Sequence, residues 1–156
     1  MHDLADAELR QLYQESLLHH SRHPCNFGEL TPPMREARGY NPLCGDKITV
    51  QLRESDDRLA AIAFSGSGCA ISLASASLMT EAVKGMTRGE TEELFAAFTA
   101  LCLGAEQARA TPLPARHEDL NIFAGVREYP MRVKCATLPW HTLRAVLEQR
   151  ETATTE

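Results

Sequence analysis

The sequence predicts an α+β fold in which helices cover a small antiparallel sheet of about three strands. Two observations lead to it: two alternating apolar segments joined by a predicted hairpin turn, and helical patterns on either side of them. The chain has 156 residues, of which 44% are hydrophobic, enough for one domain, residues 1–156, to bury its own core. We expect a monomer, because the predicted helices leave no long apolar stripe unused.

The first helix is expected to begin at an Asp6 cap and to end at His23 and Pro24. Its helical spacing is carried by Leu9, Leu12, Tyr13, Ser16 and Leu17. A loop rich in proline and glycine is then expected to run to about Tyr40.

The alternating pattern follows this loop. Ile48, Val50 and Leu52 alternate with polar residues, which predicts a half-buried strand. Residues 54 to 57 resemble a hairpin turn, and Ile62 and Phe64 place the apolar face of the returning strand on the same core. The glycine-rich residues 65 to 68 are expected to end that strand.

Helical patterns fill most of the second half. One helix is expected over residues 70 to 84, closed by Gly85, so that Cys69 falls at its start. Thr91 is expected to cap another helix, whose apolar face consists of Leu94, Phe95, Phe98, Leu101 and Cys102. Pro112 and Pro114 mark a mobile connection.

A short segment with Leu120, Ile122 and Phe123 precedes Gly125, and a last helix carries Trp140, Leu143, Val146 and Leu147. Pro139 leaves two possibilities for that helix. Either it runs through Cys135 and is kinked by the proline, or Thr137 caps a helix that begins near Pro139. The polar tail from about residue 151 is expected to fray.

Composition excludes several classes of protein. The formal net charge of −5 gives no support to nucleic-acid binding. Early acidic residues argue against a secretory signal, and no apolar run is long enough to span a bilayer. We therefore expect a soluble cytoplasmic protein, in which cysteines stay reduced and suggest a metal site or catalysis before disulfides.

Three of the five cysteines lie in informative settings. Cys44 stands in a Pro/Gly turn, Cys69 follows a Gly-Ser-Gly turn ahead of a helical pattern, and Cys135 follows the basic residues Arg132 and Lys134. Each setting favours an exposed thiol. A thiolate is the form that binds metal and attacks sulfur, and helix starts and nearby cations lower the pKa of a thiol. Together the three cysteines predict one metal- or sulfur-handling site.

These motifs resemble those of a known family. The segments Asn-Pro-Leu-Cys-Gly-Asp at 41–46, Gly-Cys-Ala-Ile-Ser at 68–72 and Arg-Val-Lys-Cys-Ala at 132–136 are similar to the three cysteine motifs of the SufU/IscU/NifU iron–sulfur assembly family. Two features make the SufU branch the closest. Lys134 stands where IscU-type chains have histidine, and 65 residues separate Cys69 from Cys135. The resemblance implies an IscU/SufU-like fold.

The candidate metal ligands are Cys44, Asp46, Cys69 and Cys135. Three thiolates and one carboxylate form a four-coordinate set suited to Zn²⁺. Around a divalent ion they leave a net charge of about −2, which nearby Arg132 and Lys134 are candidates to balance. The carboxylate is a harder ligand than a thiolate, so the set favours ligand exchange.

The resemblance implies a sulfurtransferase that works with a SufS-type, PLP-dependent cysteine desulfurase and passes sulfur to downstream iron–sulfur assembly proteins. In SufU-like proteins a desulfurase histidine takes over the zinc and frees the thiolate that matches Cys44. Cys44 is thus the expected sulfur acceptor, with Arg132 as a possible support, and Asp46, Cys69 and Cys135 stay on zinc.

Two alternatives remain open. In the first, Cys44, Cys69 and Cys135 bind iron or a [2Fe-2S] cluster, as in IscU-like scaffolds. In the second, the chain is a zinc-stabilised interaction module without chemistry.

Four further residues have structural interpretations. Cys102 lies on an apolar stripe and is expected in the core. Cys25 is expected to be an incidental exposed thiol. His19 and His20 end a helix, where a surface position with a favourable dipole contact is expected.

Overall fold

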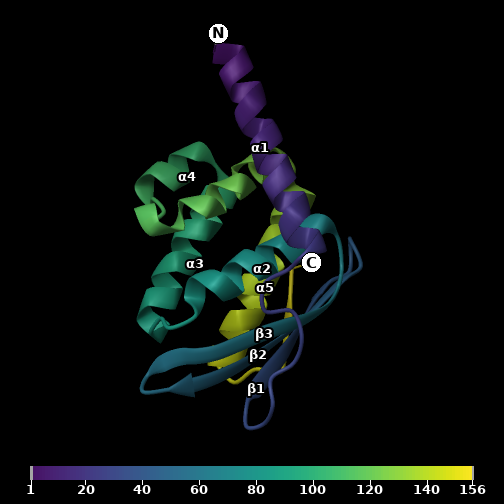
Figure 1. The fold of residues 1–156 in the computed structure, drawn as a ribbon, viewed down its shortest axis with the longest axis vertical. Coiled ribbons are helices and arrows are strands. Elements are labelled where there is room, and N and C mark those ends of the chain that lie inside the picture. The colour runs from purple at the N-terminus through teal and green to yellow at the C-terminus, as the bar shows by residue number, and fades with distance from the viewer. Residues whose placement is uncertain (1, 156) are drawn as a thin grey trace.

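The protein is described here by a computed structural model that covers the backbone of residues 2–155, with side chains described for residue 8 and residues 10–155. Helices and strands follow one another along the chain (Figure 1) as α1 (His2–Arg22), β1 (Arg35–Asn41), β2 (Asp46–Ser55), β3 (Arg58–Ser67), α2 (Ala70–Val83), α3 (Arg88–Leu103), α4 (Ala105–Ala110), the 3-10 helix η1 (Ala115–Glu128), α5 (Pro130–Leu147) and β4 (Thr152–Thr154). The α+β class predicted from the sequence is confirmed.

The sheet has four strands in the order β3-β2-β1-β4. Both β1 and β3 pair antiparallel with β2, while the short β4 pairs parallel with β1. The β2–β3 hairpin lies where the sequence predicts it. Its tip is formed by Asp56 and Asp57, which both have positive φ angles, of 55° and 62°, as a two-residue turn of this hand requires.

The sheet corrects three expectations. Residues 35–41 form β1 instead of belonging to a loop that runs to Tyr40, and residues 152–154 form β4 instead of fraying. The returning strand β3 also continues through Gly66 to Ser67 instead of ending at residue 65. Residues 46–55 and 58–67 therefore form longer strands than their apolar alternation alone indicates.

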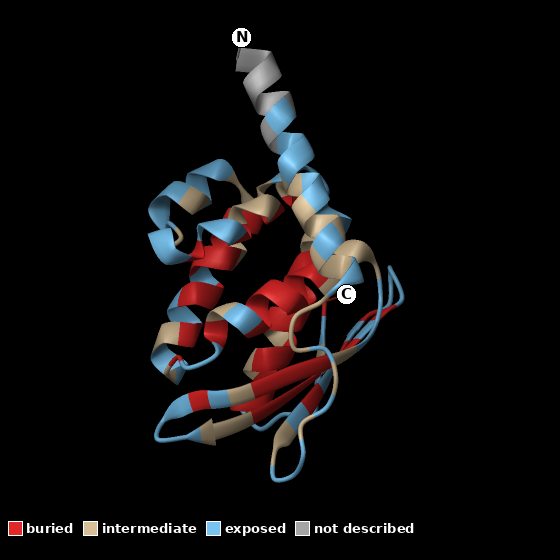
Figure 2. Ribbon diagram, in the orientation of Figure 1, coloured by how far each residue is buried: buried red, intermediate tan, exposed pale blue. Residues whose placement is uncertain are grey.

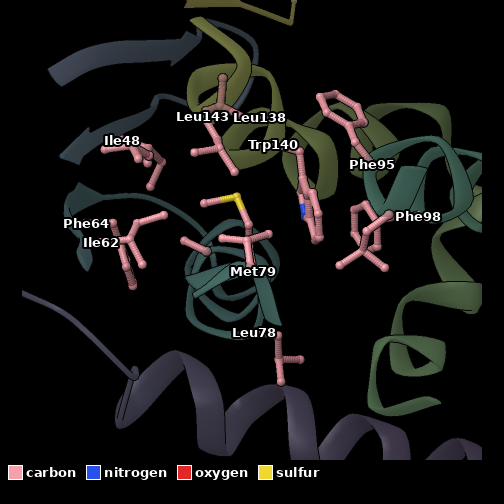
Figure 3. Packing of buried hydrophobic residues seen from close by; sticks show 14 of the residues in the cluster. Ile48, Ile62, Phe64, Leu78, Met79, Phe95, Phe98, Leu138, Trp140 and Leu143 are labelled. Atoms are coloured by element: carbon pink, nitrogen blue, oxygen red, sulfur yellow. The ribbon is translucent and has the colours of Figure 1, made fainter. Parts of the chain in front are cut away.

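The core lies between the sheet and the helices, where buried residues gather on the facing sides of both layers (Figure 2). Figure 3 shows Met79 of α2 between the sheet residues Ile48 and Ile62 and the α5 side chains. Trp140 stacks on Phe98 with ring centroids 4.6 Å apart. This stacking joins α5 to α3 and holds α5 across the sheet.

Two helix starts differ from prediction. The first helix begins at His2, so that Asp6 is not its N-cap, although it ends at Arg22 as expected. Helix α3 is capped by Thr87, whose side chain accepts from the Glu90 N–H while Glu90 accepts from the Thr87 N–H. Thr91 lies inside that helix. Every residue of the predicted apolar face of α3 is buried.

Helix α5 resolves the two possibilities left by Pro139. It runs without a break from Pro130 to Leu147, through both Cys135 and Pro139. Thr137 does not cap it, because its hydroxyl donates to the Val133 carbonyl, 2.8 Å away. The helix lies close to β1 at Gly39, where a Cβ atom would overlap the Thr142 hydroxyl. This close approach brings Cys135 to the β1–β2 turn.

Among the described residues, no helix is both long and apolar enough to cross a bilayer.

Candidate metal centre

The predicted ligands come together at one end of the β1–β2 hairpin. Ligand atoms of Cys44, Asp46 and Cys135 all lie within 4.8 Å of one another. The sulfurs of Cys44 and Cys135 are 3.2 Å apart. Cys69 lies beside this trio, with its sulfur 3.8 Å from Asp46 Oδ2. A hairpin turn, a strand start, a helix start and a helix interior thus each contribute one residue to a single cluster of three thiols and a carboxyl group.

The hairpin turn presents Cys44. Asn41 and Asp46 face each other across the last register position of β1 and β2, and the Cys44 N–H donates to the Asn41 carbonyl at 3.3 Å. Gly45 has φ +71°, a conformation that glycine adopts without steric cost. Cys44 is exposed at the tip of this turn, whereas Asp46 is 1% exposed.

The start of α2 fixes Cys69 against the hairpin. Cys69 is the N-cap of α2, as predicted, and its sulfur accepts from the Ser72 N–H at 3.5 Å. The Cys69 N–H donates to Asp46 Oδ1 at 2.8 Å. Gly68 makes room for this bond, because a Cβ atom there would lie 2.6 Å from Asp46 Oδ1.

Cys135 is not an exposed thiol. It lies inside α5 and is 1% exposed, and the preceding basic residues make no contact with it that the structure records. The guanidinium carbon of Arg132 lies over the Tyr129 ring, 4.9 Å from its centroid. Within the part of the chain that the structure describes, no hydrogen bond or ion pair joins Arg132 or Lys134 to the site.

The thiols of Cys69 and Cys135 differ in acidity. A hydrogen bond from Cys135 to its sulfur, together with the Ser72 and Ile71 N–H groups, lowers the pKa of Cys69 to about 7. The same hydrogen bond to Cys69, together with burial, raises the pKa of Cys135. Cys69 is therefore the first of this pair to become a thiolate.

The donor set fits a divalent metal ion. Asp46 is a buried carboxyl group, and burial of a carboxylate is costly unless a cation compensates it. Among the described residues, no Lys, Arg or His forms an ion pair with Asp46. A cation bound between Asp46 and the thiols would compensate this burial, and three thiolates with one carboxylate suit zinc.

Comparison with known proteins identifies the family. The family model described as NifU-like N terminal domain matches residues 12–136, a span that includes all four candidate ligands. The chain belongs to the NifU-like N-terminal domain family.

Members of the family resemble this chain over nearly its full length. The iron–sulfur cluster assembly scaffold protein IscU of Streptococcus pyogenes is 34% identical, over 96% of this chain and 91% of the relative. The zinc-dependent sulfurtransferase SufU of Bacillus subtilis is 33% identical, over 94% of this chain and 96% of that protein. The crystal structure of a nitrogen-fixing NifU-like protein (N-terminal) from Brucella abortus superposes with a TM-score of 0.73 at 28% identity, over 88% of this chain and 92% of that one.

One site residue was missed by sequence reasoning. Asn41 opens the first cysteine motif and is fully buried, with its Nδ2 3.4 Å from the Cys135 sulfur and 3.5 Å from Asp46 Oδ2. The motif itself assigned no role to Asn41. Its inward-facing position at the end of β1 would have indicated a buried side chain, but β1 itself was not predicted.

The other two cysteines and the two histidines singled out in the sequence do not join the described cluster. Cys102 is fully buried, as predicted, and burial raises its pKa to about 12. Cys25 is only half-buried instead of exposed, and its N–H donates to Ser77 Oγ at 2.8 Å. His19 is exposed as expected, but His20 is half-buried and its Nδ1 lies 3.0 Å from the same hydroxyl. His20 therefore packs on α2 instead of lying on the surface.

Proposed function

We propose that this chain is an iron–sulfur cluster assembly protein that holds zinc through Cys44, Asp46, Cys69 and Cys135 and accepts sulfur on Cys44. The donor in this proposal is the persulfide of a SufS-type, PLP-dependent cysteine desulfurase. One observation carries the choice of Cys44: it is the exposed ligand, and it receives no N–H hydrogen bond within the described chain.

The other three ligands are held by N–H donors. Cys69 receives the Ser72 N–H, Asp46 receives the Cys69 N–H, and the Asn41 amide lies within reach of both Asp46 and Cys135. For Cys44, the structure gives only the Cys135 thiol as a donor to its sulfur, and that proton leaves when the thiols ionise. Hydrogen bonds from N–H groups stabilise thiolates and carboxylates in place. Cys44 is therefore the ligand that leaves at the lowest cost.

The sulfur transfer needs no added oxidant or reductant. Bound zinc would keep the thiols deprotonated and protect them from oxidation. Once freed, the Cys44 thiolate attacks the outer sulfur of the desulfurase persulfide. The S–S bond breaks, the desulfurase cysteine leaves as a thiolate, and Cys44 becomes the persulfide. Its exposed position at the hairpin tip supports this encounter, and the buried Cys135 could not take the same role without opening of the site.

A second candidate function is a cluster scaffold. It is favoured by the similarity to a relative named as a scaffold protein and by the three thiols within one cluster, since iron–sulfur clusters are held by cysteine thiolates. In that case Cys44, Cys69 and Cys135 would hold a [2Fe-2S] cluster. The exposed, weakly held Cys44 and the single carboxylate favour sulfur transfer.

The test is sulfide release by a SufS-type desulfurase, measured with and without the zinc-loaded protein. We expect strong stimulation by the wild-type chain, none by Cys44→Ala, and wild-type stimulation by Cys25→Ala, which removes a thiol outside the site. A Cys44→Ala variant that still stimulates would refute the acceptor role. If folded wild-type protein gives no stimulation but forms a transferable, coloured cluster on anaerobic reconstitution, the scaffold function holds instead.

A further inference from the structure

Asn41 is a polar side chain buried against the metal centre. It is 0% exposed at the end of β1, and its side-chain amide reaches two candidate ligands that come from different elements. One is Cys135 Sγ on α5, 3.4 Å from Nδ2, and the other is Asp46 Oδ2 on β2, 3.5 Å away. Its Oδ1 atom is buried and has no hydrogen-bond partner among the described residues.

Packing alone does not account for an asparagine here. The inward-facing positions of β1 before it are Ala37 and Gly39, which lie against the core. A buried amide with an unpaired oxygen is less stable than a fully paired one, so an apolar residue would be the more stable choice for a purely structural position. What the amide supplies is an NH₂ group between Asp46 and Cys135.

The NH₂ group matters because the ligand set carries net negative charge when a metal is bound. Three thiolates and a carboxylate around a divalent ion carry a net charge of about −2. The cationic residues near Cys135 in the sequence, Arg132 and Lys134, make no hydrogen bond or ion pair with the site in the described structure. The Asn41 amide is the N–H donor that the structure gives to the Cys135 sulfur, so it is placed to stabilise negative charge there.

We propose that Asn41 is a positioning residue that keeps Cys135 and Asp46 on the metal and so directs ligand exchange to Cys44. This inference rests on the proposed function, because it assumes that zinc binds at this centre. The amide stabilises the ionised forms of two retained ligands from two elements, whereas Cys44 has no such donor. Without the amide, Cys135 would leave the metal almost as readily as Cys44.

The test compares Asn41→Leu, which keeps the branched heavy-atom shape but removes the amide, with Thr142→Val as the matched control. Thr142 is also fully buried next to β1, but its hydroxyl donates within α5 to the Leu138 carbonyl at 2.8 Å and touches no ligand. Zinc affinity is measured by competition with a chromophoric chelator. Cobalt substitution then reports the number of thiolates through the sulfur-to-cobalt charge-transfer absorption.

We expect Asn41→Leu to bind zinc about 10–100-fold more weakly, as loss of an outer hydrogen-bond partner typically does, with weaker charge-transfer absorption. Thr142→Val should match the wild type in both measurements. Asn41→Ala, whose smaller side chain cannot overpack the site, replaces the leucine variant if that variant does not fold.

Equal zinc affinity and equal cobalt spectra in wild type and Asn41 variants would overturn the inference while leaving the proposed function intact. An equal loss in Thr142→Val would also overturn it, since general loosening of the β1–α5 contact would then explain the result. If the folded wild-type protein itself binds no zinc, the proposed function fails first and the inference fails with it.

Discussion

Replacement of Gly68 by alanine should disturb the candidate metal centre without replacing any of its candidate ligands. A Cβ atom at this position would lie 2.6 Å from Asp46 Oδ1 and 3.1 Å from its Cγ, whereas ordinary contacts begin at 3.4 Å. The Asp46 carboxyl group must therefore move by about 0.8 Å. The Cys69 N–H donates to this same oxygen at 2.8 Å, and a shift of that size takes the bond beyond hydrogen-bond range.

The expected magnitude follows from that one bond. A hydrogen bond to a charged group contributes about 1.5–3 kcal/mol, so Gly68→Ala should weaken zinc binding by roughly 10–100-fold, at about 1.4 kcal/mol for each factor of ten. For a chain of this size, an equal loss of folding stability lowers the midpoint of thermal unfolding by roughly 3–12 °C.

Chelator competition and thermal unfolding measure both effects. Gly125→Ala is the matched control, because Gly125 is exposed and a Cβ atom there meets nothing within 4 Å. Wild-type zinc affinity together with an unchanged unfolding midpoint in Gly68→Ala would refute the reasoning, since Asp46 would then not be held against Cys69.

Three further predictions concern thiol reactivity, pH and metal removal. In the metal-free protein, iodoacetamide should modify Cys44 far faster than Cys102, which is fully buried with a pKa of about 12; peptide mass spectrometry that finds equal labelling would contradict this. Burial lowers the pKa values of His20, His117 and His141, so the unfolded chain takes up more protons than the folded chain as the pH drops below about 6.5. The free energy of unfolding should therefore decrease as the pH is lowered through that range. Urea unfolding at a pH of about 7.5 and about 5.5 checks the sign, and a rise at the lower pH would count against it. Chelation of zinc should lower the midpoint of thermal unfolding, because the buried carboxyl group of the site then loses its cation; calorimetry that gives the same midpoint with and without chelator would exclude a stabilising metal.

The elements with strong apolar periodicity were predictable, and the weakly patterned ones were not. Strands β2 and β3 carry alternating large apolar residues, so the hairpin between them was found. In β1, the inward-facing residues are Ala37, Gly39 and Asn41, which are too small or too polar to give an apolar signal. The three residues of β4, two threonines and an alanine, pair with the free edge of β1, and no local pattern encodes that pairing.

The start of a helix is hard to predict where two residues a few positions apart are both suitable N-caps. Thr91 and Thr87 are both suitable N-caps, but only Thr87 is followed three residues later by a glutamate that completes a reciprocal pair. That pattern was readable in the sequence. In contrast, the burial of His20 depends on Ser77, which is 57 residues away in the chain, and helix-end position alone could not reveal it.

The motifs singled out four residues that the structure brings together, but they did not predict the environment of these residues. Spacing and turn chemistry singled out Cys44, Asp46, Cys69 and Cys135, and the structure gathers them at one place. The burial of Cys135 and the buried amide of Asn41 follow from the crossing of α5 over β1, which is a tertiary contact without a local sequence pattern.

The most direct test of the central claim is to locate the transferred sulfur. The zinc-loaded protein is incubated with desulfurase and cysteine, thiols and persulfides are trapped by alkylation, and peptides are analysed by mass spectrometry. The account predicts the mass of one additional sulfur atom on the peptide that contains Cys44, and none on those that contain Cys69 or Cys135. Additional sulfur on Cys135 or Cys69 instead, or on none of the three, would contradict it.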